Sequence, residues 1–206
     1  MRQERTKTPE QNDNVSLPPD EIAGPSAWYG RDYLTSDEWI FRFTADDLAE
    51  IEAAVQASQS LPIKEIGQAQ FPLPKLGPRL KEMLAELLDG RGFVLMRGLP
   101  VDPSNVEHVA RAYWGIGAHL GSARSQNARG DLLGHVIDLS RSIDDPTARI
   151  YQTTARQNYH ADSCDLVGLL CLQKAMSGGA SSILSSVTIY NEMNKRRPDL
   201  ARELFF

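Results

Sequence analysis

The 206-residue sequence has few of the features that mark specialised classes of protein. Its two cysteines, Cys164 and Cys171, are too few for a disulfide framework, and we expect them to be buried free thiols. No apolar run approaches the roughly 20 residues of a membrane-spanning helix. The polar residues 1–19 lack the apolar core of a signal peptide. These absences favour a reducing compartment, with the cytoplasm as the default location.

Clusters of basic residues are missing as well. The net charge is −5 and the isoelectric point is about 5.4, which argues against nucleic acid or an anionic membrane surface as a partner. The sequence is 41% hydrophobic and 24% charged, close to the average of soluble domains, so a sizeable core can form. Residues 1–27 are rich in charge, Gln, Asn and Pro and predict a disordered tail. We expect one folded domain over residues 28–206.

Helical signals dominate the first half of the folded part. Thr44, with the acidic Asp47 three residues later, is typical of a capping box, and the apolar residues that follow predict a helix over about 45–58. A leucine-rich stripe predicts a second helix over about 76–88, with Gly90 as its C-terminal glycine.

A short buried strand is predicted between Gly92 and Gly98, because an apolar run lies between two glycines. Asp102 and Pro103 then predict the N-cap and first turn of a third helix, which extends to about residue 116.

After residue 121 the pattern changes to short strands. They are predicted at 132–139, 149–153, 158–164, 165–172 and 181–187. A helix capped by Ser186 follows over about 187–196, with Pro198 interrupting it. Helices first and closely spaced strands second favour an α+β or a helix-decorated all-β fold.

The candidate chemistry lies in a His-x-Asp pair, His160 and Asp162. If the pair lies on a strand, both side chains point to one face. An imidazole and a carboxylate on one face are two thirds of the 2-His-1-carboxylate triad of non-haem Fe(II) oxygenases. No histidine follows His160. Taken alone the pair is weak evidence, because such short patterns arise by chance; a helical scaffold with an incidental pair is an alternative that the strand-rich second half disfavours.

Longer motifs around this pair give a resemblance to a known family. They are Tyr159-His160-Ala161-Asp162, VGLLCL at 167–172 and SGGASS at 177–182, preceded in the same order by FPLP at 71–74, RGFVLMRGLP at 91–100 and QNARGDLLGHV at 126–136. With these motifs, residues 28–206 resemble the TauD/TfdA-like family of Fe(II)/2-oxoglutarate-dependent dioxygenases, and its fungal members above all.

The resemblance implies a fold, an activity and site residues. The fold is a double-stranded β-helix, or jelly-roll, with helices packed against one sheet. The activity is hydroxylation or C–H oxidation of a small organic substrate by O2, with decarboxylation of 2-oxoglutarate to succinate at Fe(II). His160 and Asp162 match the family's proximal metal ligands. Ser181 matches a hydroxyl that helps to bind 2-oxoglutarate, and Asn158 and Tyr159 fall where the family lines its substrate pocket.

The sequence also departs from the family's pattern. Ala180 stands where the family has an Asp before that hydroxyl residue. The family's distal His and its 2-oxoglutarate-clamping Arg lie on later strands, whereas this sequence stops at Phe206. We therefore expect a C-terminally truncated, incomplete jelly-roll that is inactive alone, with His119 or His135 as disfavoured replacements for the distal ligand. The alternative is a non-catalytic pseudoenzyme or interaction module. The substrate and the oligomeric state stay open.

Overall fold

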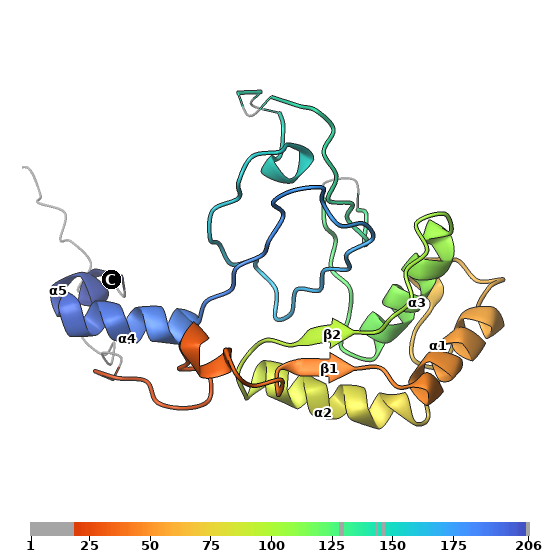
Figure 1. Ribbon diagram of the computed structural model, residues 1–206, viewed down its shortest axis with the longest axis horizontal. Coiled ribbons are helices and arrows are strands. Elements are labelled where there is room, and N and C mark those ends of the chain that lie inside the picture. Colours follow the sequence, from red (N-terminus) through yellow and green to blue (C-terminus); the bar gives the residue numbers. More distant parts are fainter. Residues whose placement is uncertain (1–18, 128–129, 143, 146, 205–206) are drawn as a thin grey trace, which may run out of the picture. The chain divides into compact units, whose positions relative to one another are not determined.

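The computed structural model describes residues 19–127, 130–142, 144–145 and 147–204 (Figure 1). The chain divides into two compact units, one made of residues 1–35 with 182–206 and one made of residues 36–181. In the described ranges, no helix is long and apolar enough to cross a membrane.

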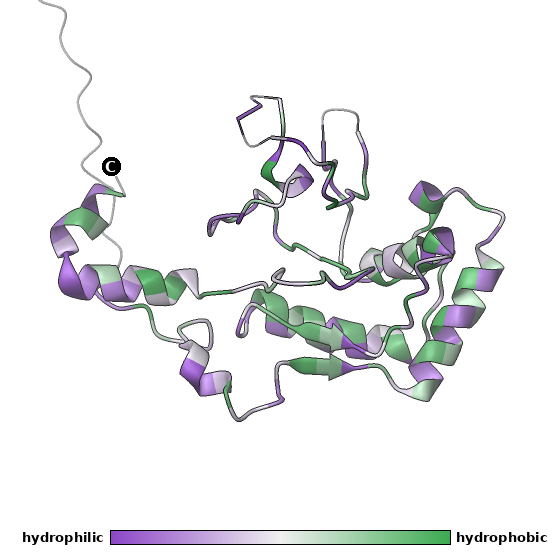
Figure 2. Ribbon diagram, turned by 45° about the horizontal axis from the view of Figure 1, so that its top comes forward, coloured by the Kyte–Doolittle hydropathy of each residue, from purple (hydrophilic) through white to green (hydrophobic). Residues whose placement is uncertain are grey.

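The larger unit contains a parallel pair of short strands. β1 (Ile40–Arg42) pairs with β2 (Leu95–Arg97), with Ile40 opposite Leu95. β2 confirms that a strand lies within residues 92–98, but its residues are half-buried or exposed and not buried, as was predicted. The helix α2 (Leu76–Leu88) runs alongside both strands in Figure 1 and Figure 2, and it carries much of the hydrophobic colour of this unit. The strand pair therefore forms one layer and α2 lies against it.

The first long helix confirms the capping signal in the sequence. α1 (Ala45–Ala57) begins after Thr44, whose hydroxyl accepts a hydrogen bond from the backbone N–H of Asp47 at 3.2 Å. The Asp47 carboxylate in turn accepts one from the backbone N–H of Thr44 at 2.7 Å. Two N–H groups that a helix start leaves without partners are thereby satisfied.

The second helix confirms its predicted range but not the predicted role of its glycine. α2 (Leu76–Leu88) is followed by Gly90, which does not adopt the left-handed conformation. The left-handed residue is Gly92, with a φ of 82°, and its N–H donates to the Glu86 carbonyl at 3.2 Å. Gly90 is needed for its lack of a side chain, because a Cβ there would lie 2.7 Å from the Glu86 carbonyl oxygen.

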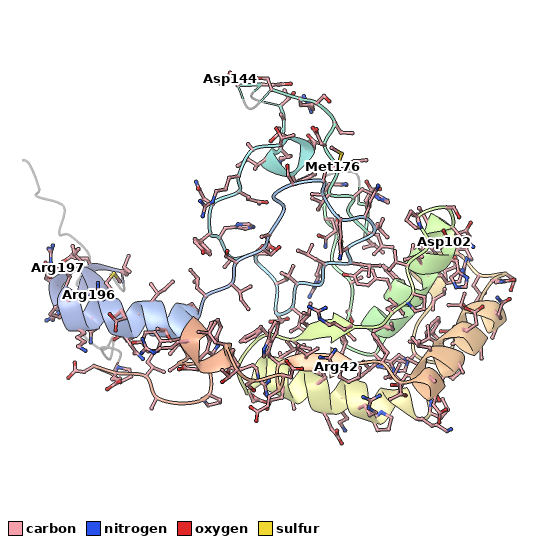
Figure 3. The ribbon with its side chains drawn as sticks, viewed as in Figure 1. Arg42, Asp102, Asp144, Met176, Arg196 and Arg197 are labelled. Atoms are coloured by element: carbon pink, nitrogen blue, oxygen red, sulfur yellow. The ribbon has the colours of Figure 1, made fainter. Side chains whose placement is uncertain are left out.

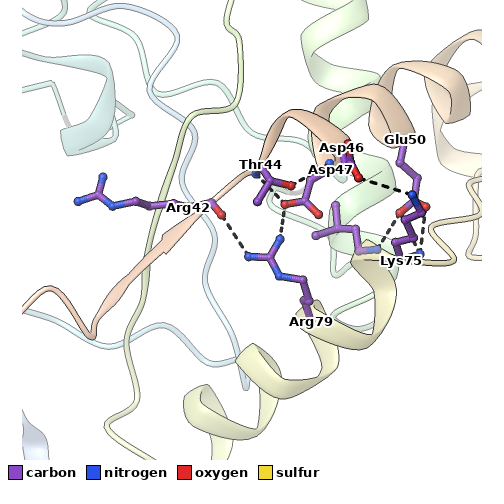
Figure 4. A network of polar contacts seen from close by, with 8 residues as sticks. Arg42, Thr44, Asp46, Asp47, Glu50, Lys75 and Arg79 are labelled. Carbon is purple, nitrogen blue, oxygen red and sulfur yellow. Dashed lines mark hydrogen bonds and ion pairs between the residues drawn. The ribbon is translucent and has the colours of Figure 1, made fainter.

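The start of α2 is capped from a neighbouring helix. Glu50 on α1 accepts hydrogen bonds from the backbone N–H of Lys75, at 3.0 and 3.2 Å, and from that of Leu76, at 2.7 Å (Figure 4). A carboxylate at a helix N-terminus satisfies free N–H groups and interacts favourably with the helix dipole. Through Glu50, α1 fixes where α2 begins.

The third helix starts later than predicted. Asn105, and not Asp102, is the N-cap of α3 (Val106–Ala118), and its side-chain oxygen accepts from the N–H of His108 at 3.3 Å. The Asp102 carboxylate accepts instead from the N–H and the hydroxyl of Ser104, at 2.9 and 2.7 Å. An Asp side chain can close such a turn as readily as it caps a helix, so the sequence signal was ambiguous.

The core of the larger unit lies among these helices and the connector between α1 and α2, which contains the short 3-10 helix η2 (Ile63–Glu65). Its largest fully buried apolar side chains are Phe71, Leu76, Leu80, Val55 and Val109. Phe71 lies so close to α3 that a Cβ at Gly115 would come within 2.4 Å of its ring. Arg111 is buried on α3 and donates to the Ser58 carbonyl at the end of α1, at 2.7 Å. These contacts hold α3 against α1.

Residues 122–181 form no strand at their described positions, and η3 (Ile150–Gln152), a 3-10 helix, is their regular element. The strands predicted at 132–139, 149–153, 158–164, 165–172 and 181–187 are absent from the described residues, so the jelly-roll is not observed. A strand exists where a neighbour completes its backbone hydrogen bonds. One such bond joins two of the predicted strands, from the Leu139 N–H to the Gln152 carbonyl at 2.9 Å, and it is too little for a ladder.

Large apolar side chains are exposed along the same stretch. They include Val136, Ile137, Val167, Leu169 and Met176, the last of which is labelled in Figure 3. Cys164 and Cys171 are exposed too, so the prediction of buried thiols was wrong. In this structure the apolar run around Cys171 has no second layer to cover it, because the expected sheet is not formed.

The smaller unit contains the helix predicted near the end of the sequence. The N-cap of α4 (Ser186–Arg196) is Ser185, immediately before the predicted cap, and its hydroxyl accepts from the Thr188 N–H at 2.9 Å. Pro198 begins a further short helix, α5 (Pro198–Glu203), whose first position tolerates a proline because its N–H would be unbonded there.

The start of the described chain is bound to α4 within this smaller unit. The Ile22 N–H donates to the side-chain oxygen of Asn191, and the Asn191 amide donates to the Ile22 carbonyl, both at 2.8 Å. The 3-10 helix η1 (Gly30–Tyr33) follows. Of the tail predicted over residues 1–27, residues 1–18 lie outside the described residues, and the rest includes this hydrogen-bonded segment.

Candidate functional site

His160 lies on the irregular, exposed stretch that follows η3. Its ring Nδ1 is 2.8 Å from the carbonyl oxygen of Asn158. Because a carbonyl can only accept, Nδ1 carries the hydrogen, and Nε2 of the neutral ring holds the lone pair. The side-chain nitrogen of Gln157 lies 3.2 Å from Nε2 and donates to it. Because Nε2 holds the lone pair, it is the ring nitrogen that can bind a metal ion.

Asp162 is exposed two positions further on, and it makes no hydrogen bond or ion pair with the rest of the described chain. Its carboxylate oxygens are thus open to a cation. The strand that was to place His160 and Asp162 on one face is not formed, so strand alternation does not orient the two side chains here.

The pair fits iron in donor type but does not complete a site. An imidazole nitrogen and a carboxylate oxygen are both ligands of non-haem Fe(II) centres. Within the described ranges, no group of three or more His, Cys, Asp and Glu side chains could hold a metal ion. His160 and Asp162 therefore supply two ligands, and a third must come from elsewhere.

The other predicted site residues are exposed along the same stretch. Tyr159 is 58% exposed, and Ser181 lies exposed at the end of the larger unit. Asn158 is exposed as well, and its main-chain carbonyl contacts His160. Their roles in binding 2-oxoglutarate and substrate stay predictions.

His119 and His135, the disfavoured replacements for a distal ligand, lie in different surroundings. The ring Nε2 of His119 is 2.8 Å from the Phe71 carbonyl, to which it donates, so His119 joins α3 to the connector before α2. His135 is exposed in the irregular stretch. Neither belongs to a three-ligand group within the described chain.

A close contact joins the stretch after His160 to α3. A Cβ at Gly168 would lie 2.6 Å from the hydroxyl oxygen of Tyr113, so the backbone of Gly168 passes directly against that side chain. Burial raises the pKa of Tyr113, which keeps the phenol neutral. The sequence carried a signal for this contact, because a glycine inside an apolar run often marks a close backbone approach.

The polar network around Asp47 has a structural role. Asp47 is buried and is bound by Arg79 of α2, which also donates to the Arg42 carbonyl at 3.2 Å (Figure 4). Burial alone would raise the pKa of Asp47, but the hydrogen bonds from Thr44 and Arg79 outweigh it and lower that pKa. The carboxylate is fully used in holding α1, β1 and α2 together.

A shallow depression of about 300 Å³ lies between α1 and α3. Gln59, His108 and Arg111 line it, and His108 lies 3.0 Å from the Glu52 carboxylate. None of the lining residues comes from the His160 stretch. The depression is therefore separate in sequence from the candidate metal ligands.

Comparison with known proteins identifies the class of protein. Residues 58–205 match the family model "Taurine catabolism dioxygenase TauD, TfdA family", which covers well over half of the chain. The chain belongs to this family. This confirms the resemblance that the motifs around His160 indicated, and the family implies a double-stranded β-helix fold.

Two curated proteins are similar to the chain over most of its length. FR-33289 synthase of Streptomyces rubellomurinus is 29% identical over 87% of this chain and 54% of its own length. Taurine hydroxylase-like protein SAT17 of Stachybotrys chartarum is 30% identical over 86% of this chain and 49% of its own length. The chain thus spans about half the length of the curated relatives it matches.

Proposed function

We propose that this chain supplies part of the site of an Fe(II)/2-oxoglutarate-dependent dioxygenase, with His160 and Asp162 as metal ligands. The observation that carries the proposal is the hydrogen bond from His160 Nδ1 to the Asn158 carbonyl, which places the lone pair of the neutral ring on Nε2, the atom that would bind the metal. Metal-binding histidines commonly hold their second nitrogen in this way.

The comparisons support the type of reaction. Membership of the TauD, TfdA family favours an oxygenase-type enzyme. One relative is named a taurine hydroxylase-like protein and another a synthase, and the first of these names favours hydroxylation of a small organic substrate. The activity of the whole protein and its substrate are part of the proposal, because the chain spans about half of each relative.

The residues of this chain take separate roles in the proposed site. His160 donates its Nε2, and Asp162 donates a carboxylate whose charge offsets that of the metal. The Ser181 hydroxyl donates a hydrogen bond to a carboxylate of 2-oxoglutarate, while Asn158 and Tyr159 contact the substrate. When bound, iron supplies the activation of O2 that is coupled to decarboxylation of 2-oxoglutarate to succinate.

A third metal ligand is missing from the described residues, and we assign it to a part of the relatives' length that this chain does not span. A non-catalytic interaction module is the second candidate. The exposure of both His160 and Asp162 favours it, because an iron site that activates O2 needs ligands shielded from water.

Fe(II) binding by the purified chain tests the proposal. Under anaerobic conditions we expect the wild type to bind Fe(II), and we expect His160→Ala to lose about tenfold or more in affinity, because a ligand nitrogen is removed. His135→Ala is the matched control, since His135 is an exposed histidine earlier in the same stretch, and it should bind like the wild type. Equal, negligible binding in all three would favour the non-catalytic module.

Turnover is a separate measurement. With Fe(II), 2-oxoglutarate and O2 present, we expect no succinate from the chain alone, because two protein ligands do not complete the site. Formation of succinate that depends on His160 would contradict the assignment of the third ligand to another segment.

A further inference from the structure

We propose that Gln157 controls access to the ligand nitrogen of His160, as a positioning residue that a metal ion must displace. The inference rests on the proposed function, since it concerns the same imidazole. One lone pair, on Nε2, would serve two partners. It now accepts a hydrogen bond from the Gln157 amide at 3.2 Å, and the proposed metal would bind to the same lone pair.

The ring of His160 is held at both of its nitrogens. Nδ1 donates to the Asn158 carbonyl at 2.8 Å, and Nε2 accepts from Gln157. The three residues fall within four consecutive positions, so the arrangement is local and needs no contact with the rest of the fold. A ring bound on both sides has little freedom to rotate, and it is oriented before a metal binds.

Removing the Gln157 amide has two opposite effects on metal affinity. It frees the lone pair, which favours binding, and it loosens the ring, which disfavours binding. The shorter bond from Nδ1 to Asn158 remains and still fixes the tautomer, so the first effect should dominate. The net gain from one hydrogen bond between neutral groups corresponds to about a fivefold change in an equilibrium constant.

Nuclear magnetic resonance of the 15N-labelled chain measures this arrangement without metal. With His160→Ala used to assign the signals, we expect the neutral wild-type ring to be protonated at Nδ1. In Gln157→Ala the Nε2 signal should shift while the Nδ1 tautomer is kept. Gln173→Ala changes another exposed glutamine of the same stretch and should leave both signals in place. A ring protonated at Nε2, or an Nε2 signal unaffected by Gln157→Ala, would overturn the inference.

Titration with Co(II), followed by its visible absorbance, measures the competition itself. We expect Gln157→Ala to bind Co(II) up to about fivefold more tightly than the wild type and Gln173→Ala to match the wild type. If the wild type binds Co(II), His160→Ala does not, and Gln157→Ala equals the wild type, this inference fails while the proposed function stands. If no variant binds Co(II), the proposed function fails and takes the inference with it.

Discussion

Two regions of the larger unit, residues 36–121 and 122–181, differ in how their backbone hydrogen bonds are completed. The first contains three α-helices, the 3-10 helix η2 and the β1–β2 pair, around a core in which Phe71 and Leu80 are fully buried. The second has a short 3-10 helix among its described residues and leaves Leu169 77% exposed. A helix bonds within itself, whereas a strand depends on a neighbour. The helices of the first region therefore depend mainly on local signals, whereas the strands predicted for the second region depend on distant partners.

Replacing one apolar side chain by alanine in each region should give the largest difference in the free energy of unfolding. Phe71→Ala removes a fully buried ring, and we expect the free energy of unfolding to fall by about 3–5 kcal/mol. Leu169→Ala removes an exposed side chain and should change it by less than about 0.5 kcal/mol. Urea unfolding followed by tryptophan fluorescence measures both. Comparable losses in the two variants would mean that Leu169 is covered in solution, and the contrast would not hold.

Asp47 extends the comparison to polar residues. It is a buried carboxylate bound by Arg79, and the described residues of 122–181 contain no buried carboxylate. Asp47→Asn keeps the side-chain shape but removes the charge that faces Arg79. We expect a loss of about 2 kcal/mol in the free energy of unfolding at neutral pH, a typical value for hydrogen bonds to a charged group.

The effect of Asp47→Asn should depend on pH in a defined direction. The folded-state pKa of Asp47 is lowered below its ordinary value of 3.8, so its stabilisation is complete above that value and is lost as the pH falls through the folded-state pKa. The difference between wild type and variant should therefore shrink in urea unfolding performed at successively lower pH below 3.8. A difference that stays constant down to acid pH would rule out the charge as its source.

The contact between Gly168 and Tyr113 tests how firmly the two regions are joined, and its expected effect is smaller than those of Phe71→Ala and Asp47→Asn. In Gly168→Ala the new Cβ would meet the Tyr113 hydroxyl oxygen at 2.6 Å, and we expect a loss of about 1 kcal/mol. Tyr113→Phe removes that oxygen, and the next ring atom lies at 3.6 Å, an ordinary contact. The double variant should therefore recover the loss in a double-mutant cycle. A neutral Gly168→Ala would show that the stretch does not dock at Tyr113.

The helices could be predicted from the sequence where one turn of the chain contains the whole signal. Thr44 and Asp47 mark the start of α1 in this way. The start of α2 could not be derived locally, because Glu50 caps it from 26 positions before Leu76. The strands predicted within residues 122–181 are not observed at their described positions. Their apolar runs predict strands, but the runs cannot supply the neighbouring strands that complete the hydrogen bonds.

The candidate site could be predicted in part. The motif around His160 predicted the family, which the family model confirms, whereas the metal-ligand pair that it indicated stays a prediction. The orientation of the imidazole could not be read from the motif, because it depends on which atoms of Gln157 and Asn158 reach each ring nitrogen. Whether Ser181 approaches His160 also depends on long-range pairing, which spacing along the chain does not encode.

We expect the β1–β2 pair to form late in the folding of the larger unit. Its strands are parallel, so they cannot be joined by a tight turn, and α1 and α2 lie between them in the sequence. Closing so long a loop loses chain entropy before the pairing returns any stability. The bonds that join α1 to α2, such as those of Glu50, shorten the gap that the strands must close. We therefore expect the strand pair to form late, and weakening it should speed unfolding while refolding keeps its rate.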